Sequence, residues 1–312
     1  MHIVLAEPLG IPENTLRNFT APLTAAGHEF TFYPDKAADD ILLTERLRDA
    51  DIALIANRPL PAHVLEKCPK LQYIDVAFTG VDHVAMDYCR QKNIPVSNAA
   101  GYSDQTVAEL TIGFAVALLR KLPACDKAVR SGGTSAQLRG REIAGRTVGV
   151  IGLGRIGRRV AQLFTAFGAR VIACDPVASD DYPMLSLNEL LSTSDIVTLH
   201  APNIPETRKM LGEKQFSLMQ PHALFINCAR GALVDAQALA DALNNDVIAG
   251  AAVDVFDLEP PLRADEPLLQ AKNCILAPHV AYLSDESMLR RAEIVFDNLA
   301  AYLAGHPQNL CR

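Results

Sequence analysis

The stretch VGVIGLGRIGRRVAQLFTAFGARVIACD, residues 148–175, decides the fold. Its first apolar run ends in Gly152, Gly154 and Gly157, spaced as GxGxxG, and its second apolar run ends at Asp175. A glycine triplet alone is a weak signal, because glycines cluster at many strand-to-helix turns. Here a helix pattern separates two strand patterns, and Asp175 follows Gly157 by 18 residues (175 minus 157), close to the roughly 20 of a dinucleotide-binding βαβ unit.

The chemistry of a dinucleotide explains these residue types. The first glycine makes the tight turn, the second lets the backbone approach the pyrophosphate, and the third lets helix and strand pack closely. The helix N-terminus offers free N–H groups to the phosphates. Asp175 would accept hydrogen bonds from the ribose hydroxyls and repel a 2′-phosphate, and no arginine follows it in CDPVAS. The sequence therefore favours NAD over NADP; the alternative for Asp175 is a polar cap on a strand end.

Working outward, apolar runs continue to alternate with helical patterns from Thr147 to the region of His279. Continuous apolar runs separated by helices are typical of parallel strands buried on both faces. We therefore predict a Rossmann-type, doubly wound α/β domain with strands in TVGVI, ARVIAC, DIVTLH, ALFINC, VIAGAAVDV and NCILA.

The first hundred residues repeat this rhythm and predict a smaller, flavodoxin-like α/β domain. Its strands are expected in HIVLAE, EFTFY, IALIA, LQYIDV and IPVSN, with helices around 15–27 and 40–50. An apolar helix begins after Ser103 and is expected to be buried between domains or subunits. A last helix, capped by Ser284, is expected to return to the smaller domain. The predicted domains are 1–99 with 283–312, and 100–282.

Composition restricts the class of protein. The chain has 312 residues, of which 49% are hydrophobic and 21% charged, and its net charge of −7 argues against a nucleic-acid surface and favours small-molecule partners. No apolar run approaches the roughly 18 residues needed to cross a membrane, and the N-terminus lacks a secretory pattern. Seven scattered cysteines, never spaced as CxxC, favour reduced thiols in the cytoplasm.

Three polar residues follow predicted strands, where open α/β sheets bind ligands. Arg230 can clamp a carboxylate, His279 can transfer a proton near neutral pH, and Glu259 can orient the histidine and favour its protonated form. Each also has a plain alternative: a surface ion pair for Arg230, a solvated loop charge for Glu259, and a polar strand end for His279. Together with a nicotinamide site they form a coherent catalytic set.

Several ordered motifs resemble those of the D-isomer-specific 2-hydroxyacid dehydrogenase family over essentially the whole chain. They are FTGVDHV (78–84), NAAGYSDQTVAEL (98–110), GLGRIG (152–157), LHAPNIPETRKML (199–211), INCARGALVD (226–235), AAVDVFDLEP (251–260) and APHVAYLSDES (277–287). The resemblance implies an NAD-dependent oxidoreductase in which Arg230 anchors the substrate carboxylate, Glu259 assists His279, and His279 is the acid/base.

The resemblance also assigns ligand contacts. The expected NAD site comprises the three glycines and Thr106, Arg155, Ile156, Asp175, His200, Pro202, Thr207, Cys228, Asp254 and His279. The expected substrate contacts are Thr79, Gly80, Arg230, His279, Leu60, Tyr102 and Tyr282. Asp254 would bind the nicotinamide carboxamide, unless it only caps a strand, and His200 is expected to line the cleft. Tyr282 would border the substrate, unless it only packs against the last helix.

The implied reaction interconverts a 2-oxo acid and a D-2-hydroxy acid, and only the resemblance implies the D isomer. Hydride passes to or from NAD while His279 gives or takes the proton. Leu60 stands near a position where D-lactate dehydrogenases have tyrosine, which counts against a dedicated D-lactate enzyme, while Arg58 could bind a second anionic group or serve only at the surface. The alternative function is an NAD(H)-sensing interaction protein of the corepressor type. The resemblance implies a homodimer and leaves the substrate and the physiological direction open.

Overall fold

The computed structural model describes residues 1–259 and 261–311 and divides the chain into two compact units. The small unit is Met1–Ser103 with Leu283–Arg312, and the large unit is Asp104–Tyr282. The first predicted boundary, after residue 99, lies four residues before this division (103 minus 99). Pro260, the last residue of the AAVDVFDLEP motif, and Arg312, the last residue of the predicted small domain, lie outside the described residues.

The small unit contains a five-stranded parallel sheet in the order β2-β1-β3-β4-β5, the flavodoxin-like order. Every residue of β3 and β4 is buried, as continuous apolar strands require. The strands are β1 (His2–Leu5), β2 (Glu29–Phe32), β3 (Ile52–Ile55), β4 (Tyr73–Val76) and β5 (Val96–Asn98). Its helices are α1 (Glu13–Ala25), α2 (Asp40–Leu47), α3 (Ala62–Leu65), α4 (Met86–Lys92) and α11 (Asp285–Leu303).

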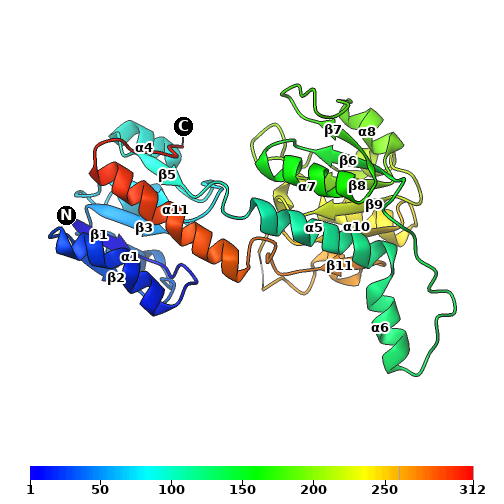
Figure 1. Ribbon diagram of the computed structural model, residues 1–312, viewed down its shortest axis with the longest axis horizontal. Helices are drawn as coiled ribbons and strands as arrows, with labels where there is room; N and C mark the ends of the chain where they lie inside the picture. Colours follow the sequence, from blue (N-terminus) through cyan, green and yellow to red (C-terminus); the bar gives the residue numbers. More distant parts are fainter. Residues whose placement is uncertain (260, 312) are drawn as a thin grey trace. The chain divides into compact units, whose positions relative to one another are not determined.

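Helix α11 returns the chain to the small sheet, and Figure 1 shows it beside the strands of that sheet. Ser284 caps the helix by accepting a hydrogen bond from the Ser287 N–H at 3.2 Å. Further along, the Asn298 Nδ2 donates to Oδ1 of Asp75, in the middle of β4, at 3.2 Å. The chain that follows pairs antiparallel with β5, because the Cys311 N–H donates to the Val96 carbonyl at 2.8 Å.

The large unit contains a six-stranded parallel sheet in the order β11-β10-β9-β8-β6-β7. Its strands are β6 (Thr147–Ile151), β7 (Arg170–Cys174), β8 (Ile196–Leu199), β9 (Leu224–Asn227), β10 (Gly250–Val253) and β11 (Cys274–Leu276). Beyond β7, Met184 forms a single parallel bridge with Ala173, where a Rossmann sheet has its third strand. If that bridge is counted as a strand, the sheet contains the complete Rossmann strand order, and β11 is one additional strand at the opposite edge.

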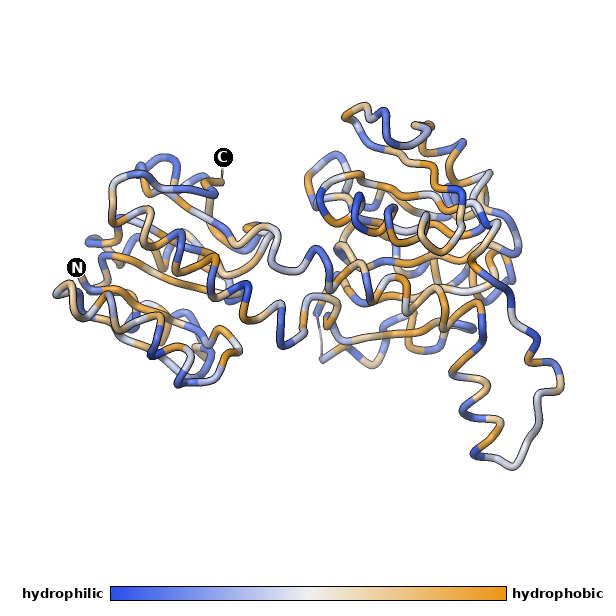
Figure 2. The backbone as a smooth tube through the Cα atoms, in the orientation of Figure 1, coloured by the Kyte–Doolittle hydropathy of each residue, from blue (hydrophilic) through white to orange (hydrophobic). Residues whose placement is uncertain are grey.

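Helices and two apolar clusters cover the faces of the large sheet. One cluster contains Ile151 and Val197, and the other contains Val148 and Val150, because successive strand residues face opposite ways. Figure 2 shows the hydrophobic strands of each unit between more hydrophilic outer segments. The helices are α5 (Asp104–Leu119), α6 (Leu122–Arg130), α7 (Arg155–Ala166), α8 (Leu187–Thr193), α9 (Glu213–Phe216) and α10 (Ala236–Asn244), with short 3₁₀ turns η1 (Gly231–Leu233) and η2 (Pro267–Gln270).

Helices α5 and α6 differ sharply in burial. Helix α5 packs against α7 and buries seven residues, as its apolar sequence predicts. Helix α6 buries none of its residues and projects away from the large sheet (Figure 1). Among the described residues, no helix combines the length and apolarity needed to cross a bilayer.

Candidate active site

The strand register brings the candidate residues of the large unit to one edge of its sheet. The last paired positions of the six strands form a single row: Cys174, Ile151, Leu199, Asn227, Val253 and Leu276. The residues after this row include the glycine turn, Asp175, His200, Arg230, Asp254 and His279. Because carboxyl ends of parallel strands share an edge, residues up to about 130 positions apart in sequence meet there (279 minus 152).

The glycine turn is built as a dinucleotide requires. Gly152 has a positive φ of 89°, and an added Cβ would lie 2.7 Å from the backbone of His200 and Ala201. A Cβ on Gly157 would lie 1.9 Å from the Gly152 carbonyl oxygen. At Gly154, by contrast, a Cβ would meet open space, and this exposed residue is the N-cap of α7. The turn thus presents bare backbone and a helix N-terminus, which fits a pyrophosphate.

Asp175 lies beside this turn and shapes it. Its Oδ2 accepts a hydrogen bond from the Leu153 N–H at 2.7 Å, and its Oδ1 accepts one from the Val177 N–H at 2.8 Å. Each carboxylate oxygen can accept a further bond, so a ribose hydroxyl can still be bound. The nearby Arg158 donates to the Asp181 carboxylate and to the Ser179 hydroxyl. The arginine in this region, Arg158, is therefore already paired with the Asp181 carboxylate.

His279 and Glu259 lie together. The His279 Nδ1 is 3.2 Å from the Glu259 Oε1, and the two side chains remain 30% and 43% exposed. The Tyr282 ring meets the imidazole edge to face, with 5.5 Å between ring centroids. The histidine backbone has a φ of 54°, in the left-handed region that few non-glycine residues adopt. The proton-transfer pair inferred from sequence is thus a spatial pair, partly open to solvent.

Arg230 follows β9 on a loop that a buried amide organises. The Asn227 Nδ2 donates to the Arg230 carbonyl at 3.1 Å, and its Oδ1 accepts from the Ala229 N–H at 3.0 Å. Gly231 packs so closely that an added Cβ would lie 2.0 Å from the Phe256 carbonyl carbon. This contact joins the Arg230 loop to the segment that leads to Glu259. Sequence reasoning did not single out Asn227, although its place at the strand end, inside INCARG, was the available signal.

Asp254, expected to bind the nicotinamide carboxamide, follows β10 at the same sheet edge. Its side chain is fully buried, and its two oxygens accept hydrogen bonds from the Val280 N–H at 2.9 Å and the Ala281 N–H at 2.8 Å. Burial raises the pKa of this carboxyl, and these two N–H groups act in the opposite direction. In this structure its hydrogen bonds go to the segment that follows His279.

His200 and Cys228 are both neutral groups of the edge. Burial lowers the pKa of His200 to about 3, and its Nε2 lies 2.8 Å from the Thr198 hydroxyl. A neutral imidazole cannot donate a proton as His279 is expected to. Burial raises the pKa of the Cys228 thiol to about 12, so it is no thiolate nucleophile at neutral pH. Both suit the wall of a cofactor pocket.

The remaining residues expected at the NAD site lie on three segments of the large unit. Thr106 belongs to α5, while Arg155 and Ile156 begin α7, which packs against α5. The Arg155 Nε donates to Asp104 at 2.8 Å, and its side chain is 69% exposed. On the loop after β8, the Thr207 hydroxyl donates to the Pro202 carbonyl at 2.6 Å. This hydrogen bond therefore joins two residues of the same loop and stabilises its conformation.

Two expected substrate contacts of the small unit, Leu60 and Tyr102, have buried side chains. Leu60 is fully buried in the core of the small unit, because its backbone pairs with the segment around Val84 and turns the apolar side chain inward. Tyr102 is only 2% exposed, with its ring 6.0 Å from that of Phe78. Neither side chain offers a surface to a substrate in this structure.

Two other substrate contacts expected in the small unit follow β4. Thr79 is exposed and Gly80 is partly exposed, and the Asn98 side chain holds the Thr79 carbonyl at 2.7 Å. Arg58 does not project as a free cation, because its guanidinium donates to Asp40 at 2.7 Å. The Thr79 carbonyl is thus bonded within the small unit, and Arg58 is paired with Asp40.

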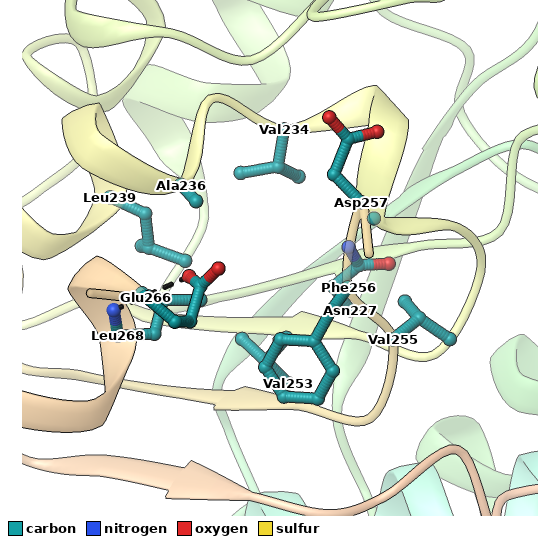
Figure 3. A pocket seen from close by; sticks show the side chains of 11 residues that line it. Asn227, Val234, Ala236, Leu239, Val253, Val255, Phe256, Asp257, Glu266 and Leu268 are labelled. Carbon is teal, nitrogen blue, oxygen red and sulfur yellow. Dashed lines mark hydrogen bonds between the residues drawn. The ribbon is translucent and has the colours of Figure 1, made fainter. Parts of the chain in front are cut away.

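A small cavity lies among the segments that follow β9 and β10 (Figure 3). Its volume is about 20 Å³, room for little more than a water molecule. The lining side chains shown in Figure 3 come from the ends of β9 and β10, the start of α10 and the η2 turn, where the Glu266 carboxylate caps the Leu268 N–H. This cavity is too small for an organic acid and lies among packing residues.

Comparisons with known proteins agree with this geometry. Residues 112–281 match the family model described as D-isomer specific 2-hydroxyacid dehydrogenase, NAD binding domain. A glycerate dehydrogenase of Methylorubrum extorquens is 36% identical, over 95% of this chain and 94% of that protein. A D-3-phosphoglycerate dehydrogenase of Methanocaldococcus jannaschii is 37% identical over 84% of this chain, which spans about half (52%) of that longer relative.

A solved structure extends the similarity over the whole fold. An acyclic imino acid reductase in complex with NADPH and D-Arg superposes with a TM-score of 0.92, at 29% identity, over 100% of both chains. The predicted family and the predicted fold class, two parallel α/β sheets, are confirmed. The chain belongs to the D-isomer-specific 2-hydroxyacid dehydrogenase family, a family of NAD-dependent oxidoreductases.

Proposed function

We propose that this protein interconverts a small 2-oxo acid and the corresponding D-2-hydroxy acid, with His279 as the acid/base. One observation carries the proposal: the Nδ1 of His279 lies 3.2 Å from the Glu259 carboxylate, at the same sheet edge as the glycine turn. The residues around Gly154 and Asp175 fit NAD, whose reduced form would supply the hydride. Turnover of a 2-oxo acid with NADH tests the proposal directly.

The protein's own residues divide the remaining work. In the reducing direction, the His279 imidazolium protonates the carbonyl oxygen as hydride arrives at C2. Glu259 fixes the ring orientation through Nδ1, which leaves Nε2 to face the substrate. The Arg230 guanidinium binds the carboxylate, and Asn227 shapes the loop that carries it. In the oxidising direction His279 takes up the proton instead.

The cofactor preference we propose is NAD over NADP. Asp175 stands where the adenosine ribose is bound in this fold, and a 2′-phosphate there would meet its negative charge. Arg158, the nearby cation, is paired with Asp181 and would have to leave that pair to neutralise the phosphate. NADH should therefore give a much higher kcat/KM than NADPH. Equal values would show that Asp175 does not discriminate.

For the substrate we propose a short 2-oxo acid of the hydroxypyruvate class. The similar glycerate dehydrogenase is named for the corresponding hydroxy acid, and the Tyr282 ring packs edge to face against His279, the proposed acid/base. A panel of hydroxypyruvate, glyoxylate, pyruvate, phenylpyruvate and 2-ketogluconate, followed by NADH absorbance, would rank the candidates. Absence of turnover with every acid would reject the enzymatic proposal.

We further propose a cytoplasmic homodimer. All seven cysteines are free thiols, as a reducing compartment would keep them. Helix α6 buries no residue, and its Leu122 and Val129 are 49% and 76% exposed, which suits coverage by a second copy. Light scattering after size-exclusion chromatography measures the mass directly, and a monomer at micromolar concentration would reject the dimer.

A further inference from the structure

Asn98 ends β5, and its side chain bonds to the loop that follows β4. Its Nδ2 donates to the Thr79 carbonyl at 2.7 Å, and its Oδ1 accepts from the Ala100 N–H at 3.3 Å. The next residue, Ala99, donates its N–H to the Phe78 carbonyl at 3.0 Å. The end of β5 therefore holds two successive carbonyls of this loop.

The bond to Thr79 determines the direction of the next N–H group. The Thr79 carbonyl and the Gly80 N–H belong to one planar trans peptide, so they point in opposite directions. Because Asn98 holds the carbonyl, the Gly80 N–H is directed away from Asn98. Glycine has unusual backbone freedom, so this peptide plane could turn if the bond were lost. Gly80 is partly exposed, and its backbone is an expected substrate contact.

The backbone of Asn98 is itself held by a buried side chain of α11. Asn298 is fully buried, and its Nδ2 donates to the Asn98 carbonyl at 3.0 Å and to the Asp75 Oδ1 at 3.2 Å. The Asn98 N–H donates to the Asn309 carbonyl at 3.1 Å. The Asn309 Nδ2 in turn donates to the Asn298 Oδ1 at 2.7 Å. Both backbone groups of Asn98 are therefore fixed, which fixes the position from which its amide reaches the loop.

We propose that Asn98 is a positioning residue that fixes the Thr79–Gly80 peptide and so presents the Gly80 N–H to the carboxylate of the 2-oxo acid. The inference rests on the proposed function and deepens it, because it names the side chain that prepares the small unit for its substrate. A hydrogen bond from an N–H group to a carboxylate is charge-assisted and depends on direction. If Asn98 only closed the end of β5, its loss would lower stability without a selective effect on the substrate.

Two substitutions remove the donor in different ways. Asn98→Ala removes the whole amide, whereas Asn98→Asp keeps its shape and replaces the donor by an oxygen that repels the Thr79 carbonyl. We expect both to raise the KM of the panel acid that wild type reduces best by about tenfold, the loss typical of one hydrogen bond to a charged group. The kcat should change by less than about threefold, because His279 is untouched. The NADH dissociation constant, measured by fluorescence quenching, should change by less than about twofold.

Ser97→Ala is the matched control. Ser97 is the preceding residue of β5, is fully buried, and donates its hydroxyl to the Gln308 carbonyl at 2.6 Å. The control therefore removes a side-chain bond to a carbonyl from the same strand without touching the Thr79 loop. Its melting temperature measures the general cost of loosening β5, and its KM should keep the wild-type value.

A second readout needs neither turnover nor cofactor. Thr79–Gly80 is the only Thr-Gly pair in the sequence. Protein labelled with ¹³C at the threonine carbonyls and with ¹⁵N at glycine therefore gives a single NMR signal that correlates this carbonyl with this N–H. We expect the signal to move in both Asn98 variants and to stay in place in Ser97→Ala.

Three results would overturn the inference. An unmoved Thr79–Gly80 signal in both Asn98 variants would show that the peptide is held without the amide. A KM that rises in Asn98→Asp alone would show repulsion of the substrate by the new charge instead of lost positioning. Equal rises of KM in Asn98→Ala and Ser97→Ala would show general loosening of β5. If wild-type protein reduced no 2-oxo acid, the proposed function would fail on its own, and the NMR signal would still decide whether Asn98 fixes the peptide.

Discussion

Replacing Asp75 by asparagine should stabilise the small unit at neutral pH. Asp75 is a fully buried residue of β4 that accepts one hydrogen bond, from Asn298, on Oδ1. Within the described part of the chain, its Oδ2 has no hydrogen-bond partner. Burial raises the pKa of this carboxyl from 3.8 to about 8. Asparagine has nearly the same shape and cannot ionise.

The direction and magnitude of this stabilisation follow from the linkage between proton binding and folding. A carboxyl whose folded pKa exceeds its unfolded pKa binds its proton more tightly in the folded state, so stability falls as pH rises between the two values. That window runs from 3.8 to about 8. Between 3.8 and neutral pH lie about three pH units, each worth about 1.4 kcal/mol, so the cost at pH 7 is at most about 4 kcal/mol. Water entry and local rearrangement reduce it.

Amide hydrogen exchange of peptides from β4 and α11, followed by mass spectrometry, measures this effect within the small unit. The free energy of opening in wild type should fall from about pH 5 to about pH 8, whereas Asp75→Asn should lack that part of the decline. The gap between the two proteins should widen with rising pH. A constant gap, or a less stable variant at pH 8, would refute the assignment of a costly buried carboxyl.

Three further predictions concern the large unit. His279→Gln should lower kcat by about a thousandfold, as loss of general acid catalysis requires; stopped-flow hydride transfer measures this, and a loss below tenfold would remove His279 from the chemistry. Arg230→Ala should raise the KM of the 2-oxo acid by at least about tenfold, because a charge-assisted carboxylate contact is lost; loss of NADH affinity instead would contradict its role as substrate anchor. Gly231→Ala should lower both activity and melting temperature, since its Cβ would lie 2.0 Å from the Phe256 backbone; a variant with wild-type melting and kinetics would show that the contact with Phe256 relaxes freely.

The βαβ unit and the candidate residues at the strand ends could be proposed from sequence because each depends on local patterns. The glycine spacing, the alternation of apolar strands and helices, and the polar residues at strand ends all appear within short stretches. The parallel register then brings these stretches to one edge without further information. The single bridge at Met184 was not predicted, because a strand of one paired residue leaves no periodic pattern.

Leu60 and Tyr102 illustrate what sequence position could not decide. Both lie in loops next to expected ligand segments, and position in a family motif does not say whether a side chain turns inward or outward. The pairing of Leu60 with Val84 turns the leucine into the core, and the rings of Phe78 and Tyr102 pack edge to face. These orientations depend on contacts between segments, which no local pattern encodes.

At the sheet edge of the large unit, a buried side chain at a strand end twice binds the backbone of a segment that carries a candidate residue. Asn227 and Val253 are paired residues of β9 and β10, and Asp254 follows directly. The Asn227 side chain fixes the loop of Arg230, and the Asp254 side chain fixes the segment of His279. Asn227 and Asp254 are both buried, so water does not compete for their hydrogen bonds. Arg230 and His279, which are expected to contact substrate, can therefore remain partly exposed while buried hydrogen bonds fix their backbone. We expect substitutions of Asn227 or Asp254 to lower turnover more than substrate affinity.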